Sequence, residues 1–367
     1  MEEEMSTSPR PARVVLPGQI LNNELDARGW TQRDLATIIG RPYQAINEIV
    51  NGSKQITPDT ARELARAFST SIDFWINLET NYRLHLAEQD KKEKEIIRWS
   101  RLYNFAPIRE MIKRSWIKGS DNINELEQQI CSFFEISSLD SPLSMTASFR
   151  QSENHSVEIM SLSAWIQQVK NLAKEQPVGK FSITKLNDAI PLLFASSVDL
   201  EFLPKVTDFL GDLGIHFILL PHMSHTYVDG AAVIGNSNPI IALTLRYDRL
   251  DSFWFTLAHE LAHIASGHKG EIWDDTERGS GSANKSEEDK ANTLASEWLV
   301  DQRLLSKYIS DVKPYFSKES IQRFASQIAR HPAIVLGQLH NKKVVEYSHL
   351  RNVLVKVKPY LNEYMHQ

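Results

Sequence analysis

The sequence predicts a mostly helical α+β protein. Three observations support this. Helix start and stop signals follow one another closely from Pro17 onward, β-like runs are found only after Gly214, and 367 residues exceed one ordinary domain. We therefore expect a flexible tail (1–14), a five-helix N-terminal domain (15–83), a helical connector (84–185) and a C-terminal domain with a small β-sheet (186–367).

Composition places the chain among globular proteins, because 42% of its residues are hydrophobic and 24% are charged. Glutamates occupy positions 2–4, where a secretory signal carries basic residues, and no run is apolar enough to span a membrane. Cys131 is the one cysteine, which fits a reducing compartment and excludes a multi-cysteine zinc site. We expect a cytoplasmic protein without a membrane partner, in which any metal is held by histidine and carboxylate.

Each N-terminal helix has a local signal. A first helix carries Leu21 and Leu25 inward and stops at Gly29, and Thr31 can cap the second. The third begins near Pro42 and ends at Asn51-Gly52, and Thr57-Pro58 starts the fourth. A fifth runs from Ser71 to about Arg83. Short helices joined by a tight glycine turn are the outline of a helix-turn-helix domain.

The amino-acid sequence of this region identifies the type of domain more specifically than the number of its helices does. The stretches TQRDLA, INEIVNG, ITPDTA and FWINLE, between Pro17 and Tyr82, resemble the HigA-type antitoxin branch of the XRE helix-turn-helix family. Such a domain places its third helix in the major groove of an operator. The expected phosphate contacts are Gln32 and Arg33, and the expected base readers are Arg41, Tyr43, Gln44 and Asn47.

Charge alone favours only weak DNA binding. Between Val14 and Thr70 the sequence has six basic and six acidic residues, so the domain has little net attraction for phosphate. The stretch Lys91–Lys118 carries nine basic and three acidic residues, which is either a phosphate-facing surface or a solvated helix face. We expect a homodimer or this basic stretch to strengthen binding.

Three β-like runs mark the C-terminal domain: 215–221, 231–235 and 239–245. They are followed by FTLAHELAHIASGH, 255–268, which we expect on a helix from about Asp251 to Ser266. His259 and His263 are then one turn apart on one face, about 6 Å along the axis, and both can bind one ion. Glu260 points about 100° away, so it can reach water on the ion without ligating it.

A catalytic zinc usually takes three protein ligands and leaves one position for water. The next helical stretch, Glu287–Val300, offers Glu287 and Glu288 near the start of its inward face, and spacing alone does not choose between them. His268 follows the break at Gly267 and is a weaker candidate.

The segment from Leu186 to Leu350, with FTLAHELAHI, EEDKANTLASEWL and AIVLGQLHNKKVVEYSHLRN, resembles the ImmA/IrrE metallopeptidases. The resemblance implies a zincin-like domain that binds Zn²⁺ through His259, His263 and Glu288, since the family glutamate stands three residues before an Ala-Asn pair. Two departures, Ser-Glu-Trp-Leu-Val after Ala295 and His-Glu-Leu-Ala-His in place of the commoner glycine form, leave the ligands unchanged.

These observations predict a DNA-binding transcriptional regulator that carries a zinc-dependent endopeptidase domain. Glu260 is the expected general base, and the substrate implied by the resemblance is a protein: a partner repressor, a toxin or the protein itself. The oxyanion donor is left open among His331, His222, His225 and Tyr227. In the alternative, the protein is a non-catalytic antitoxin whose zincin-like domain senses a signal or binds a toxin. The loop Arg278–Lys285 is either an active-site rim or an ordinary surface loop.

Overall fold

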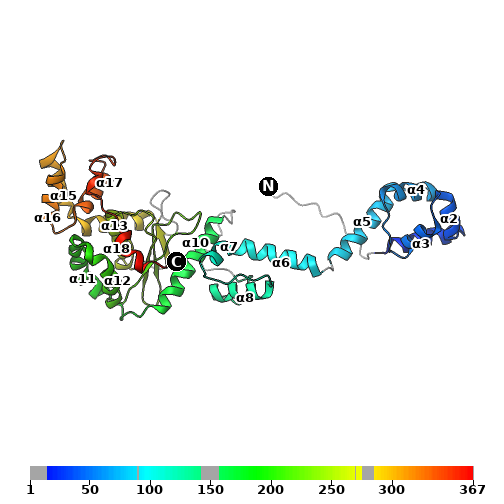
Figure 1. The fold of residues 1–367 in the computed structure, drawn as a ribbon, viewed down its shortest axis with the longest axis horizontal. Coiled ribbons are helices and arrows are strands. Elements are labelled where there is room, and N and C mark those ends of the chain that lie inside the picture. Colours follow the sequence, from blue (N-terminus) through cyan, green and yellow to red (C-terminus); the bar gives the residue numbers. More distant parts are fainter. Residues whose placement is uncertain (1–14, 89–90, 142–156, 269, 275–284, 367) are drawn as a thin grey trace. The chain divides into compact units, whose positions relative to one another are not determined.

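A computed structural model describes residues 15–88, 91–141, 157–268, 270–274 and 285–366. Its chain forms two compact units, Met1–Arg101 and Leu102–Gln367, and each is described by itself (Figure 1). The expected tail 1–14, the polar residues 152–155, which the sequence indicates as a surface loop, and most of the loop Arg278–Lys285 lie outside the described residues. Among the described residues, no helix is both long and apolar enough to cross a membrane. The expected domain limits stay predictions.

The first unit begins with the five expected helices and ends within a sixth, α6 (Lys91–Phe105). The five are α1 (Pro17–Arg28), α2 (Gln32–Ile39), α3 (Tyr43–Val50), α4 (Pro58–Phe68) and α5 (Ile72–Glu88). The predicted signals are confirmed: Gly29 ends α1 with φ 68°, and the Thr31 side chain accepts a hydrogen bond from the Asp34 amide. Thr57 caps α4 through the amide of Thr60. Each cap satisfies an amide that the first helical turn leaves unpaired.

Apolar side chains at helical spacing fill the core of this unit, among them Leu21, Leu35, Ile46 and Leu64. Trp75 of α5 is fully buried, and its indole nitrogen donates to the hydroxyl of Thr70 at 2.8 Å. Other aromatic residues of α5 are less buried than Trp75, since Phe74 is 41% exposed. The helix α5 is also five residues longer than expected at its C-terminal end.

The connector is helical, as predicted, and consists of α6 (Lys91–Phe105), α7 (Ile108–Lys113), α8 (Ile123–Phe134) and α10 (Val157–Glu175). One apolar face of α8 and one of α10 are buried, with Ile130 and Trp165 almost fully covered. The α7 end is tied to the loop after the first strand, because Arg114 donates to the carbonyl oxygens of Pro221 at 2.9 Å and His222 at 2.6 Å.

In the described residues, four strands form one mixed sheet in the order β1-β3-β2-β4. The strands are β1 (His216–Leu219), β2 (Gly230–Ile234), β3 (Ile240–Leu243) and β4 (Gly270–Asp274). The first and third are parallel, with His216 opposite Ile240, and the other two pairs are antiparallel. Three of these strands were predicted. The fourth was not, because Gly270–Asp274 carries two charged residues in five and becomes a strand only by pairing with β2.

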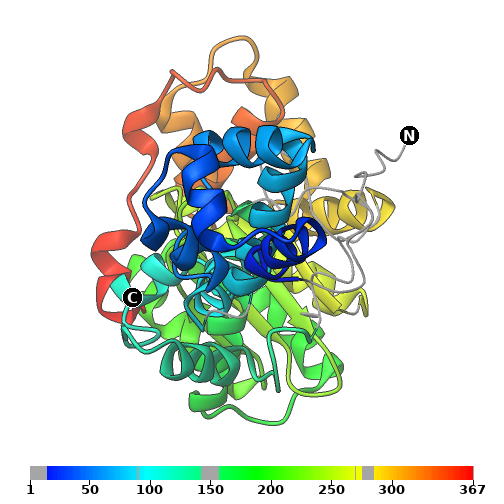
Figure 2. The ribbon, with the colours of Figure 1, turned by 90° about the vertical axis from the view of Figure 1, so that its right-hand side faces the viewer.

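Helices surround the sheet and bury a large apolar core. They are α11 (Ile183–Ala195), α12 (Val206–Asp212), α13 (Leu250–Ala265), α14 (Lys285–Leu299), α15 (Gln302–Val312), α16 (Lys318–Gln327), α17 (Pro332–Asn341) and α18 (Lys358–Leu361). The central one is α13, which packs against α14, α17, β2 and β3. The orange helices α15 and α16 lie close to each other in both views (Figure 1 and Figure 2). The predicted α+β fold class is therefore confirmed, and α13 is the element that carries the HELAH motif.

Candidate metal centre and DNA-reading helix

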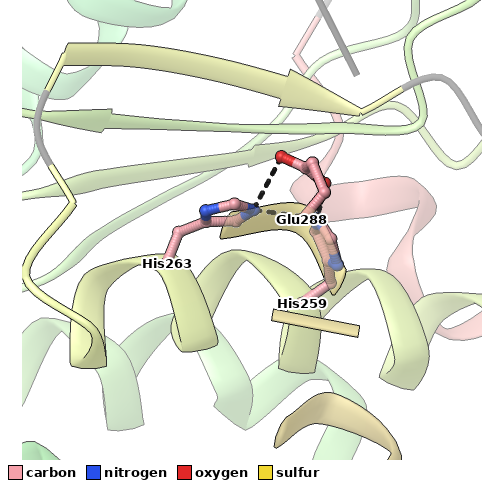
Figure 3. A group of neighbouring side chains, drawn as sticks. All are labelled: His259, His263 and Glu288. Atoms are coloured by element: carbon pink, nitrogen blue, oxygen red, sulfur yellow. Dashed lines mark hydrogen bonds and ion pairs between the residues drawn. The ribbon is translucent and has the colours of Figure 1, made fainter. Parts of the chain in front are cut away.

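Two histidines of α13 and one glutamate of α14 lie together in the second unit. The Nε2 atoms of His259 and His263 are 3.0 Å apart, and the Glu288 carboxylate faces both, with oxygens 3.2 and 3.3 Å from the two nitrogens. Figure 3 shows the imidazoles rising from α13 and the carboxylate pointing toward them, with strands of the sheet passing above. All three residues are buried, at 1%, 0% and 8% exposure.

The packing of α14 on α13 explains why Glu288, and not Glu287, reaches the histidines. Ala291, Ala295 and Leu299 recur at helical spacing after Glu288 and are buried, so this stripe of α14 faces the core. Glu288 begins the stripe and is buried with it. Glu287 lies one residue earlier, about 100° around the helix, and is half-buried.

The spacing of these atoms fits a tetrahedral ion. Zinc bonds of about 2.0–2.1 Å to nitrogen and oxygen imply ligand atoms about 3.3 Å from one another. The three distances, 3.0, 3.2 and 3.3 Å, lie close to that value. Among the described residues, this is the group of histidine and carboxylate side chains whose ligand atoms converge closely enough to hold one ion.

Neighbouring polar groups keep both Nε2 atoms available as ligands. The Nδ1 of His259 is 3.1 Å from Oδ1 of Asn292, so Nδ1 donates and Nε2 keeps its lone pair. The Nδ1 of His263 is 2.8 Å from Nδ1 of His268. Burial and the neighbouring His263 lower the pKa of His268, which favours the neutral ring that accepts this hydrogen bond.

Asn292 was not among the predicted site residues, although it lies four positions after Glu288 and therefore on the same helix face. The sequence also offers His268 as a weaker candidate ligand. It lies on the outer side of His263, outside the group of three.

Glu260 lies next to the group without belonging to it. Its side chain is fully buried, and one carboxylate oxygen is 2.8 Å from where a Cβ on Gly230 would stand. The same position is 2.5 Å from Cγ2 of Thr256, one turn earlier on α13. Gly230 thus lets β2 lie directly on α13 beside Glu260.

The four candidate oxyanion donors have different surroundings. His331 caps α17, since its Nδ1 accepts from the amide of Ala333 at 3.1 Å. His222 lies in the loop held by Arg114, and burial, then the charges of Arg246 and Arg114, lower its pKa. The Tyr227 ring lies under the Arg246 guanidinium, 5.2 Å from its centroid. His225 adopts φ 65° in the same loop. These contacts single out none of the four.

In the first unit, most predicted DNA contacts occupy one surface formed by α2 and α3. Gln32 accepts a hydrogen bond from Asn47 at 3.2 Å, and the Arg33 guanidinium lies 5.6 Å from the ring centroid of Tyr43. Tyr43 and Gln44 are exposed in the first turn of α3, where the domain type places its base readers. Gln44 donates to Glu48 at 3.0 Å, an exposed contact that a base edge can replace.

Arg41 is more constrained than the sequence indicates. Its guanidinium forms a two-pronged pair with Glu63 of α4, and this hydrogen bond raises the pKa of Arg41. Reading a base would require this pair to open. In the basic stretch, Arg114 is likewise engaged in structure, with Glu110 at 2.9 Å.

Family models match both parts of the chain. One described as helix-turn-helix matches residues 21–75, and one described as IrrE N-terminal-like domain, the Peptidase_M78 family, matches residues 211–326. Virulence-associated protein I of Dichelobacter nodosus is 42% identical over 85 residues, which are 23% of this chain and 79% of that protein. The chain belongs to the helix-turn-helix regulators. Its C-terminal part is a peptidase-like domain of the ImmA/IrrE type.

Other relatives of this helix-turn-helix regulator match the same N-terminal part. An uncharacterized HTH-type transcriptional regulator of Haemophilus influenzae is 37% identical over 76 residues, 20% of this chain and 71% of its own length. A solved addiction module antidote protein of the HigA family from Coxiella burnetii is 35% identical and covers 22% of this chain and 90% of its own, with a TM-score of 0.21. The regulator thus combines an N-terminal DNA-binding domain with a C-terminal peptidase-like domain.

Proposed function

We propose that this regulator binds an operator as a homodimer through α3 and that its C-terminal domain is a zinc-dependent endopeptidase. The observation that carries the second half is the convergence of His259, His263 and Glu288 at 3.0–3.3 Å, beside a buried Glu260 that is not part of the group. Two imidazoles and one carboxylate are the ligand set of many catalytic zinc sites.

The residues divide the chemistry among them. His259, His263 and Glu288 would hold the ion, which when bound supplies Lewis acidity to a water molecule and to the scissile carbonyl. A Glu260 carboxylate oxygen accepts the proton of the attacking water and passes it to the nitrogen of the leaving amine. Asn292 and His268 keep the imidazole tautomers that ligate through Nε2. The substrate class is a protein, either a repressor or a toxin partner.

Two variants separate ligation from proton transfer. His259→Ala removes a ligand, so we expect it to lose zinc and activity together. Glu260→Gln keeps the shape and loses the base, so we expect zinc to be retained and cleavage to be lost. The measurements are zinc content of the purified protein and cleavage of co-expressed partner proteins. Equal zinc loss in both variants would contradict the roles assigned.

A second function is favoured by the antidote relatives and by the near-complete burial of the three metal-site residues. In this second function, the zincin-like domain binds a toxin or senses a signal, and the ion only stabilises the fold. The same experiment separates the two functions. If the unmutated protein holds one zinc and cuts no partner, while a toxin copurifies equally with the wild type and with Glu260→Gln, the binding function replaces the peptidase.

The proposed binding of operator DNA through α3 is tested by a substitution at Gln44. An amide paired with an adenine edge is worth about 1–3 kcal/mol, so Gln44→Ala should weaken binding to the selected site by roughly 5- to 150-fold. The DNA is a duplex selected from a random library with the full-length protein, and affinity is read by gel shift at fixed salt. Gln19→Ala, on the exposed face of α1, is the matched control and should bind like wild type. Unchanged affinity of Gln44→Ala would remove Gln44 from the reading helix.

A further inference from the structure

A cavity of about 310 Å³ lies beside the N-terminal half of α13 in the second unit. Ser252, Phe255 and Thr256 of α13 form one wall, and Leu299 at the end of α14 and Ile334 of α17 form others. The volume is at the lower end for small-molecule sites, which is room for one large side chain but not for a bulky cofactor.

Two residues of the cavity wall, Ser252 and Thr256, lie on the face of α13 that carries the candidate metal ligands. Ser252, Thr256, His259 and His263 follow one another at spacings of four, three and four, so they lie along one stripe of the helix. At 1.5 Å per residue, Thr256 is about 4–5 Å and Ser252 about 10 Å from His259 along the axis. The Phe255 ring stacks on the His259 ring with centroids 6.4 Å apart. A polypeptide with its scissile bond at the metal group could therefore place a neighbouring side chain in this cavity.

The walls favour an uncharged occupant. Phe255, Leu299, Ile334 and Tyr347 contribute aromatic and aliphatic surface. The charged residues lining the cavity, Arg249 and Asp251, are bonded to each other, with Nε 3.1 Å from Oδ1 and a second contact between Nη2 and Oδ2 at 2.5 Å. Their charges cancel locally, so a lysine or glutamate entering the cavity would lose hydration without gaining a full counter-charge.

We propose that this cavity is a specificity pocket that takes a large uncharged side chain, aliphatic or aromatic, of the substrate polypeptide beside the scissile bond. The proposal rests on the peptidase function above, and it adds the substrate preference that the motif does not give. Asn341 at the end of α17 is exposed and lines the cavity, which makes it the position from which the pocket can be blocked with least disturbance of the core.

The test uses the full-length, zinc-loaded protein and a series of short peptide hydroxamates that differ only in the side chain next to the hydroxamate: glycine, leucine, phenylalanine, lysine and glutamate. Affinity is measured by calorimetry, so turnover is not required. We expect leucine and phenylalanine to bind about 10- to 100-fold more tightly than glycine, from the apolar surface they bury. Lysine and glutamate should bind no better than glycine.

Asn341→Trp should reduce the advantage of leucine and phenylalanine to less than about threefold while the glycine compound binds as before. Lys342→Trp is the matched control, because Lys342 is the next residue in the chain, is also exposed and does not line the cavity. A second variant, Tyr347→Ala, removes an exposed aromatic wall and should weaken binding of phenylalanine several-fold.

Three results overturn the proposal, and they are distinguishable. Equal affinity of all five compounds for the wild type, or an unchanged preference in both Asn341→Trp and Tyr347→Ala, rejects the pocket and leaves the metal site standing. Failure of every compound to bind the zinc-loaded protein, glycine included, rejects a metal that a substrate can reach, and with it the peptidase function on which the pocket rests.

Discussion

Glu288 offers the sharpest single-residue prediction, because it has a neighbour of the same type that serves as its control. Removing Glu288 takes away one of three protein ligands, each within 3.3 Å of another. Zinc binding at structural sites amounts to about 10–16 kcal/mol for four ligands, or about 2.5–4 kcal/mol for each. Glu288→Ala should therefore weaken zinc binding on the order of 10²- to 10³-fold. Glu287→Ala should change it by less than about twofold.

The assay is competition for zinc between each variant and a chromophoric chelator at pH 7.5, with circular dichroism to verify that both variants fold. Glu288→Gln completes the series, because it keeps the volume of the side chain and removes its charge. The zinc affinity of Glu288→Gln should be as low as that of Glu288→Ala. Equal affinities for Glu288→Ala and wild type, or a comparable loss in Glu287→Ala, would refute the assignment of the third ligand.

Two further predictions concern the surroundings of the site. Gly230→Ala would press its Cβ against Thr256 and Glu260, so we expect the free energy of unfolding to fall by about 1–3 kcal/mol and the activity to fall as well. Gly235 has open space around it, so Gly235→Ala should not change the stability measured by denaturant unfolding. Equal stability of the two variants would contradict this close packing. Burial lowers the pKa of His340, so the unfolded chain takes up its proton at higher pH than the folded chain, and stability is lost as pH falls below about 6.5. His340→Gln should therefore lose less stability between pH 7 and 5.5 than wild type does, and parallel curves would show that His340 ionises alike in both states.

The helix boundaries of the first unit, apart from the C-terminal end of α5, could be predicted because the signals are local. Thr31 and Thr57 cap helices through amides three residues away, and Gly29 ends a helix through its own backbone. Such interactions depend on the adjacent residues and need no tertiary contact. The HELAH helix was predictable for the same reason, since its period fixes which side chains share a face.

Other features depend on residues distant in the sequence. The strand Gly270–Asp274 exists because β2 offers it a partner, and its own composition does not favour a strand. The choice between Glu287 and Glu288 needs the orientation of α14 on α13, which spacing within α14 leaves undetermined. Arg41 has the side chain of a base reader, and only the fold brings Glu63 of α4 against it.

The central claim is tested most directly by X-ray absorption at the zinc edge on the purified full-length protein, together with metal content per chain. We predict one zinc per chain, with two imidazole nitrogens and one carboxylate oxygen at about 2.0–2.2 Å from the protein and a remaining light-atom ligand from solvent. His259→Ala should lose one imidazole from that shell or lose the metal entirely. A wild-type protein that binds no zinc, or a zinc shell without two imidazoles, would contradict the account.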